Sequence, residues 1–485
     1  MIERRTETSS AGHDSRQAMT GFAGHKSQRA ATTPSGYDRQ RAGDLTRGGI
    51  TGTLLCFTLP MIAGSLLQQC YNIADTIIVG RFVGAEALAA VGSAYTLMVF
   101  ITSILIGLAM GSGTVFSLKF GEGDSDGMKK SLTASFILIG GVTVLLVILA
   151  FSTLGPILRW LQVPADVQPL MEDYLWIIYW GIGFTFLYNY SAALLRAVGD
   201  SVTPLLWLAG AALLNIGLDL LFILSFGWGI QGAAAATVIS QAVSGIGLCI
   251  QVLVTRPEFR PGRQYWRPDW KVLKYIGTFS SLTCIQQSVM NLGILAVQGL
   301  VNSFGTAVMA AFAAAVKIDS FAYMPVQEFG NAFSTFVAQN YGADRHERIR
   351  KGIIRAVCIM AAFSVAISAI VFICADPLMR IFVSGAETEI IRIGKEYLRV
   401  EGAFYIGIGL LFMLYGYYRA ICRPGMSVIL TVLSLGTRVA LSFVLAPMAG
   451  IGELGIWWSI PIGWALADLV GTVYYFRTRP QTVWK

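Results

Sequence analysis

The stretch LLQQCYNIADTIIVG, Leu66 to Gly80, decides the fold class, because it is apolar enough to cross a membrane and still carries a carboxylate, Asp75. Placing an acid at the centre of a bilayer costs about 2.5 to 3.5 kcal/mol on insertion scales. A membrane helix that keeps such a residue is expected to turn it toward the protein interior or toward water. The question is whether the rest of the chain is built for a membrane.

The composition answers that question. Of the 485 residues, 55% are hydrophobic and 13% are charged, and the mean hydropathy is +0.62. Soluble domains carry about 25% charged residues. Apolar segments long enough to span a hydrocarbon core of about 30 Å recur along the chain. The sequence therefore predicts an all-α polytopic membrane protein with twelve transmembrane helices, at 51–79, 86–116, 131–153, 170–195, 203–225, 230–254, 274–301, 307–337, 353–374, 396–418, 426–446 and 455–476.

The positive charges predict the orientation. The net charge of +8 could indicate a nucleic-acid partner, but most Lys and Arg residues fall in the tail and in the loops of one side. The positive-inside rule then places both termini in the cytoplasm, in a multi-pass protein of the cell inner membrane, with no nucleic acid expected. The opposite side carries Arg81, Arg159, Arg380, Arg392, Lys395 and Arg399.

Several residue types argue against an enzyme. The seven cysteines have no paired spacing, so they indicate neither a disulfide nor a metal site. The three histidines, His13, His25 and His346, lie outside the predicted spans. No GxxxxGK[ST] phosphate-binding loop is present in the sequence, so transport driven by ATP is not expected either.

The two halves of the chain resemble each other. FVGAEALAAVG (82–92) matches FGTAVMAAFA (304–313), which pairs Gly84 with Gly305, and a following match pairs Gly121 with Gly342 at the same spacing. Because six spans are an even number, both halves enter the membrane from the same face, as in a parallel repeat. We expect two pseudo-symmetric six-helix bundles with these boundaries: a disordered cytoplasmic tail 1–45, an N-terminal lobe 46–255, a cytoplasmic linker 256–273, a C-terminal lobe 274–478 and a cytoplasmic C-terminus 479–485.

Two acids inside the predicted spans of the first lobe are the strongest functional candidates. Asp75 and Asp219 each have a hydrogen-bonding side chain four residues earlier, Tyr71 and Asn215, which lies on the same helix face. No Lys or Arg lies within their spans. We interpret them as groups that bind and release a proton or a sodium ion; the alternative is a structural hydrogen bond or salt bridge between helices.

The second lobe offers polar residues of a different kind. Lys317 and Asp319 are two residues apart and so point in different directions, and we expect a structural or gating role for them. In the repeat, Arg438 stands where the first lobe has Asn215, so the second lobe is expected to have lost the acid site. The other candidate partners within or near the spans are Glu328, Asp468 and Glu401.

Four motifs resemble the multidrug and toxic compound extrusion (MATE) transporters: NIADTIIVGRFVGAEALAAVG, LLRAVGDSVTP, NIGLD and MPVQEFGNAFSTFVAQNYGA. The likeness covers about residues 46 to 478 and is nearest to the DNA-damage-inducible branch of prokaryotic members. It implies a two-lobed antiporter that alternates between inward-open and outward-open states and expels small, amphiphilic, cationic compounds. It implies no cofactor beyond the coupling ion, H⁺ or Na⁺, and we expect a monomer in the lipid bilayer.

Residue by residue, the resemblance implies a first-lobe cation site and a helix that bends. The site residues are Asp75, Tyr71, Asn215, Asp219, Thr237 and, by position, Tyr174; a bound Na⁺ would use Asp75, Asp219, Asn215 and Thr237. Pro60 matches the proline whose helix bends on protonation. The family's other main branch places acids in the second lobe, where this chain has Gln286, Gln287, Asn291, Tyr405 and Gly407, so the likeness does not extend to that site.

Two alternatives remain open from the sequence. A lipid-linked saccharide flippase of the same superfamily would need a basic cleft for a pyrophosphate group, to which Lys317 and Arg438 could contribute. A membrane enzyme or receptor with two homologous halves is the third possibility.

Overall fold

The computed structural model describes residues 43–160, 163–164, 166–267, 269–448 and 450–478, and within these ranges the regular elements are helices without any strand. The predicted tail 1–45 lies outside the described residues except for its last three positions. The predicted C-terminus 479–485 lies outside them entirely. Everything below concerns the described part of the chain.

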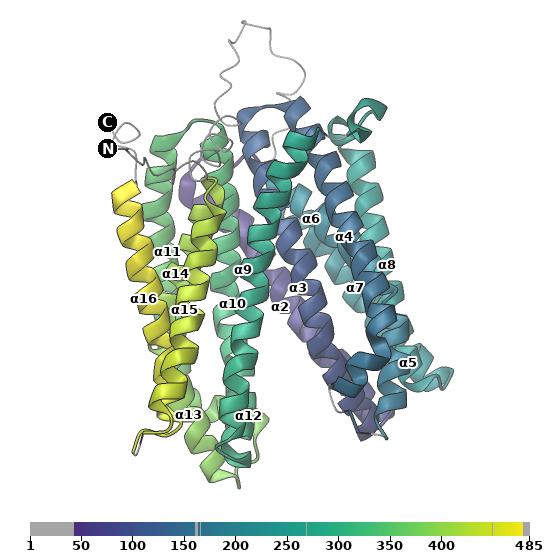
Figure 1. The fold of residues 1–485 in the computed structure, drawn as a ribbon, viewed down its shortest axis with the longest axis vertical. Helices are drawn as coiled ribbons and strands as arrows, with labels where there is room; N and C mark the ends of the chain where they lie inside the picture. The colour runs from purple at the N-terminus through teal and green to yellow at the C-terminus, as the bar shows by residue number, and fades with distance from the viewer. Residues whose placement is uncertain (1–42, 161–162, 165, 268, 449, 479–485) are drawn as a thin grey trace, which may run out of the picture. The chain divides into compact units, whose positions relative to one another are not determined.

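Figure 1 shows the helices as two side-by-side groups within the described chain. The first group holds α2 (Ile50–Phe82), α3 (Ala85–Glu122), α4 (Ser125–Trp160), α5 (Gln168–Ile178), α6 (Gly181–Ala197), α7 (Val202–Leu220) and α8 (Gly229–Thr255). Two short 3₁₀ turns, Pro257–Phe259 and Arg263–Trp266, lie in the predicted linker. The second group holds α9 (Trp270–Asn302), α10 (Thr306–Gly342), α11 (His346–Ile373), α12 (Ala375–Phe382), α13 (Thr388–Gly402), α14 (Tyr405–Ala420), α15 (Pro424–Leu445) and α16 (Leu454–Thr478).

Among the described residues, nine helices are long and apolar enough to cross a membrane, and α13 with α14 would make a tenth span with a 51° bend. The two remaining predicted spans correspond to α9 and to α5 with α6. The predicted helix 170–195 is therefore interrupted between Ile178 and Gly181, and the predicted helix 396–418 is interrupted between Gly402 and Tyr405. The expected all-α membrane fold is confirmed, with these two spans broken.

Each group of helices has its own apolar core. The first core includes Val79, Leu105 and Tyr179, and the second includes Phe312, Tyr397 and Trp457. A third cluster draws on both groups, because Leu54 and Leu118 pack with residues of α10 and α11 such as Phe336 and Ile349. These residues lie toward the predicted cytoplasmic ends of their helices, so the lobes are joined there.

Glycines allow the two lobes to approach each other closely at this end. A Cβ atom on Gly111 of α3 would lie 2.6 Å from Ser280 Cα of α9, so the two backbones are in direct contact. The contact of Gly121 and Gly342 is reciprocal: a Cβ on Gly121 would lie 2.0 Å from Gln339 O, and one on Gly342 would lie 2.2 Å from Leu118 O. The repeat pairs these same two glycines, as expected for a pseudo-two-fold axis between α3 and α10.

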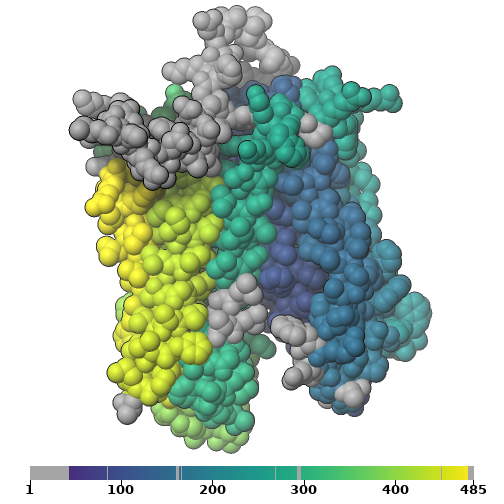
Figure 2. All heavy atoms as spheres, in the orientation of Figure 1, coloured from purple at the N-terminus to yellow at the C-terminus, as the bar shows by residue number. Residues whose placement is uncertain are grey.

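Toward its other end, α2 packs with the first lobe. Leu54, Phe57 and Met61 belong to the cluster that draws on both lobes, whereas Ile78 and Val79 belong to the core of the first lobe. Figure 2 shows a notch between the lower ends of the blue and the green helices. The lobes therefore meet at one end and diverge at the other; with the predicted orientation, in which the joined end is cytoplasmic, this arrangement is outward-open.

Candidate cation site in the first lobe

Four helices of the first lobe meet around the predicted acids. Helix α2 packs against α7 and α8, and α5 packs against α8. Tyr71 and Asp75 come from α2, and Asn215 and Asp219 from α7, each pair one turn apart on its helix. Helices α8 and α5 supply the remaining two, Thr237 and Tyr174. The structure thus brings all six predicted residues together.

The carboxyl groups of Asp75 and Asp219 lie side by side, within hydrogen-bonding reach of each other. The Asp219 side chain is fully buried, and one oxygen of each carboxyl group is buried without a hydrogen-bond partner in the described chain. Among the described residues, no Lys or Arg lies near enough to shift the charge state of either group. Two adjacent negative charges in a low-dielectric site repel each other, so the pair needs a shared proton or a bound cation.

Asn215 connects the acids to α8. In one orientation its amide Nδ2 donates to Thr237 Oγ1 at 3.3 Å. With the amide turned, Nδ2 donates to Asp219 Oδ2 at 3.0 Å, and the amide oxygen accepts from Thr237 Oγ1 and Thr237 N, both at 3.3 Å. The second orientation satisfies both ends of the amide and leaves Asp219 with a donor. Asn215 therefore holds Asp219 and Thr237 in a fixed relation.

Two tyrosines complete the wall of the site. The Tyr71 hydroxyl is within hydrogen-bonding reach of Thr237 and faces Asp75, and the Tyr174 hydroxyl faces both acids. The site thus combines two carboxyl groups, one amide, one threonine hydroxyl and two phenol rings. Oxygen-rich groups of this kind can hold a proton or a hard cation such as Na⁺.

The local backbone at Asp219 is unusual, and the sequence did not reveal it. Helix α7 ends at Leu220, and a π-helical turn follows at once over Leu221–Ser225. Such turns are rare and are frequently found at functional sites. Asp219 thus lies where the regular helix gives way. On the other side of the site, α2 runs unbroken through Pro60, about four turns before Asp75, and Pro60 leaves one helical carbonyl without its donor.

The second lobe brings two of its predicted candidate acids together. Asp319 and Glu401 are both buried and lie within hydrogen-bonding reach of each other, and Tyr405 Oη donates to Asp319 Oδ1 at 2.7 Å. Arg438 lies near enough to act on both acids. Neither acid occupies the position that the repeat pairs with Asp219, which is Ser442, so the expected loss of the first lobe's acid site stays a prediction.

Glu401, a candidate partner from the sequence, shares a helix face with a tyrosine. Tyr397 precedes Glu401 by one helical turn, with the same spacing as Tyr71 and Asp75, and the two side chains are within hydrogen-bonding reach. The other predicted second-lobe residue, Lys317, is exposed and is not brought to this group. Asp468 of α16 is a separate buried acid, with one oxygen that has no partner in the described chain.

Comparison with known proteins decides the family. The model of the MatE family matches residues 60–221 and again residues 283–444. The chain belongs to the MatE family. Its members are transporters, so the protein is not an enzyme, as predicted. The two matches correspond to the two halves that the sequence repeat pairs. The predicted domain boundaries and the assignment to a branch of the family stay predictions.

The relatives of this MatE chain cover nearly its whole length. The probable multidrug resistance protein YpnP of Bacillus subtilis is 30% identical over 434 residues, which are 89% of this chain and 96% of that protein. A protein named FAD transporter, from Shewanella oneidensis, is 26% identical over 82% of this chain and 87% of its own. The solved structure of an outward-facing multidrug resistance MATE transporter has a TM-score of 0.85 at 24% identity, covers 92% of this chain and 99% of its own, and shows that the fold is shared.

Proposed function

We propose that this MatE transporter is a secondary active multidrug exporter that exchanges organic cations or other amphiphilic compounds against protons or sodium ions by alternating access. The cell inner membrane, with both chain termini in the cytoplasm, is the proposed location. The observation that carries the proposal is the pair Asp75 and Asp219: two carboxyl groups side by side, one fully buried and the other partly buried, with no electrostatic effect of a cationic side chain among the described residues on either.

Competition by charge supplies the mechanism. When the first-lobe site faces outward, the two acids take up a coupling ion, and a bound cationic cargo loses its negative partner and leaves. When the site faces inward, release of the ion restores the negative charge and a new cargo binds. One charge that moves across the membrane field is worth about 2.3 kcal/mol per 100 mV, so an ion gradient is an adequate energy source.

The assignment to the first lobe follows from charge compensation. Arg438 acts on Asp319 and Glu401, which gives that acid pair a permanent positive neighbour. The pair Asp75 and Asp219 has none among the described residues. A site that must exchange one mobile cation for another needs an uncompensated negative charge, which favours the first lobe. In this proposal Pro60 is the point at which α2 bends when the charge at Asp75 changes.

The cargo class rests on the chemistry of the site and on the relatives. The rings of Tyr71 and Tyr174 stand beside the two acids, and aromatic faces attract organic cations. The relative YpnP is named a probable multidrug resistance protein. A flippase for a lipid-linked saccharide has less support, because Lys317 is exposed and the charge of Arg438 acts on the buried acids Asp319 and Glu401, which does not favour one basic cleft.

Uptake into everted membrane vesicles tests the proposal. Ethidium and norfloxacin uptake is measured under an imposed proton gradient and, separately, an imposed sodium gradient, with FAD and a lipid-linked sugar as comparison cargoes. The wild-type chain should accumulate the first two compounds under at least one gradient. Asp75→Asn and Asp219→Asn should each lower gradient-driven uptake by roughly tenfold or more, since a neutral amide cannot exchange the ion.

The control is Asp173→Asn, the same substitution at an exposed first-lobe acid on α5, and its uptake should equal that of the wild type. Unchanged uptake in both site variants would exclude ion coupling at this pair. Movement of the lipid-linked sugar alone would favour the flippase.

A further inference from the structure

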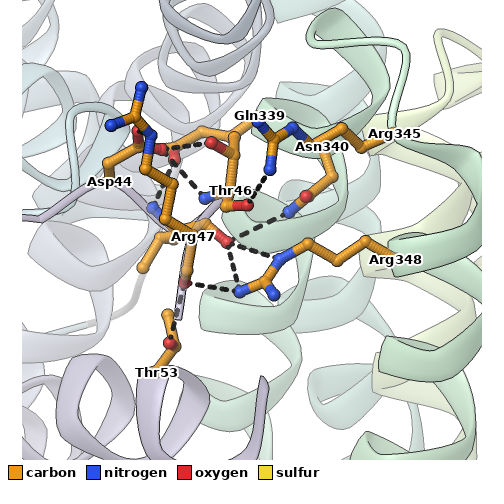
Figure 3. A network of polar contacts seen from close by, with 9 residues as sticks. Asp44, Thr46, Arg47, Thr53, Gln339, Asn340, Arg345 and Arg348 are labelled. Carbon is orange, nitrogen blue, oxygen red and sulfur yellow. Dashed lines mark hydrogen bonds and ion pairs between the residues drawn. The ribbon is translucent and has the colours of Figure 1, made fainter. Parts of the chain in front are cut away.

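The short segment before α2, residues 43–48, forms a strap across the joined end of the two lobes. Figure 3 shows its polar contacts. Leu45 is 3% exposed and Thr46 is 4% exposed, although both lie in a stretch without helix. Leu45 packs in the apolar cluster that draws on both lobes, which also includes Leu118 of α3 and Phe336 of α10. The strap is therefore part of the packed structure and not a loose connection.

Two arginines of the second lobe bind the strap from one side. Arg348 of α11 donates to the carbonyl oxygens of Leu45 at 3.1 and 3.2 Å, Arg47 at 2.7 Å and Gly48 at 2.7 Å. Arg345 donates to the Thr46 carbonyl at 2.8 Å. Four consecutive carbonyl groups are thus held by two guanidinium groups, whose fixed fork of donors suits such a row of acceptors.

The first lobe holds the strap from the other side. Gly43 lies directly on the turn between α6 and α7, because a Cβ atom on Gly199 would lie 1.7 Å from Gly43 O. The Gln339 side chain then links all three parts: it accepts from Leu45 N at 3.0 Å and donates to Ala197 O at 2.8 Å. Gln339 belongs to α10 of the second lobe and Ala197 to α6 of the first. The strap and Gln339 together tie the lobes across this end.

We propose that residues 43–48 act as a conformational latch that stabilises the outward-open arrangement. To open this end, the lobes must separate, and the strap cannot then keep both Gly199 on one side and Arg348 on the other. The strap runs directly into α2, which carries Pro60 and Asp75, so the latch also fixes the starting position of the helix that holds the candidate cation site. The inference rests on the proposed alternating access.

Distances between two spin labels test the latch. In a chain whose cysteines are replaced, labels are attached at Lys130 of α4 and Lys351 of α11, which are exposed residues at the latched end of different lobes. Double electron–electron resonance on the purified protein then measures how often this end is open. Arg348→Gln and Gln339→Ala should each raise the ratio of open to closed molecules by roughly tenfold, within the usual range of conformational coupling.

Arg355→Gln is the matched control, because Arg355 is exposed on the same helix and makes no hydrogen bond or ion pair with the strap in the described structure. It should leave the distance distribution unchanged. If Arg348→Gln does not fold, Gln339→Ala decides alone. A wild-type distribution in the latch variants would overturn the inference. The distance measurement involves no transport. Unchanged distances in the latch variants would therefore leave the exporter proposal intact, and an absence of transport in the vesicle assay would not change the distances.

Discussion

At the scale of single residues, the acids Asp75 and Asp219 gain their proposed role from what surrounds them. The same carboxyl group beside an arginine would be a structural ion pair, whereas beside another carboxyl group it needs an exchangeable cation. The second-lobe acids Asp319 and Glu401 show the contrast, since Arg438 acts on both. Neighbours therefore distinguish the two acid pairs better than burial does.

Asn215 offers a prediction at this scale. Asn215→Ala removes the amide that can donate to Asp219 Oδ2 at 3.0 Å and leaves that oxygen buried without its donor. A hydrogen bond to a charged group is worth about 1.5 to 3 kcal/mol, so exchange of ethidium by reconstituted protein should slow by roughly 10- to 100-fold. Asn189→Ala is the control, because Asn189 Nδ2 donates only within its own helix, to Thr185 O at 2.8 Å. Equal rates in the two variants would contradict the role of Asn215.

The site was largely predictable from sequence, and the reason is local. Tyr71 with Asp75 and Asn215 with Asp219 share a helix face at a spacing that any α-helix enforces. Thr237 and Tyr174 came only from the family resemblance, because nothing local links α8 or α5 to the acids. Glu401 was named only as a candidate partner, because its burial beside Asp319 depends on how α13 packs against α10, which is a tertiary property.

At the scale of helices, close packing of α3 against α9 fixes the contact between lobes. Gly111→Ala would place a methyl group 2.6 Å from Ser280 Cα, which the two backbones cannot absorb without moving apart. Overpacking of this kind costs about 1 to 3 kcal/mol. We expect a lower thermal unfolding temperature in detergent, measured by the fluorescence of a thiol-reactive dye.

Gly92→Ala lies on the same helix, where a new Cβ would meet nothing within 4 Å, and it should leave the unfolding temperature unchanged or slightly higher. Similar temperatures for Gly111→Ala and wild type would show that the lobes can separate at this contact without cost.

Helix breaks were the part of the fold that the sequence did not predict. The apolar runs 170–195 and 396–418 each read as one continuous span, because hydropathy registers length and composition but not direction. The chain leaves the helical path between Ile178 and Gly181 and again between Gly402 and Tyr405. The π turn after Asp219 escaped notice for the same reason.

At the scale of the whole described chain, the repeat explains how two lobes meet around one axis. Gly121 lies against Gln339, three residues before Gly342, and Gly342 lies against Leu118, three residues before Gly121. The same repeat has diverged in its chemistry: one lobe keeps an uncompensated acid pair, and in the other the positive charge of Arg438 lies near the acids. Such asymmetry suits an exchanger in which one lobe senses the ion and both lobes move.

The central claim is that coupling ion and cargo compete for Asp75 and Asp219. The most direct measurement is the Kd of tetraphenylphosphonium for the purified protein over a series of proton and sodium concentrations. We predict that the wild-type Kd rises in proportion to the concentration of one of these ions and that Asp75→Asn/Asp219→Asn loses this dependence. A wild-type Kd that stays constant in both series would contradict the account.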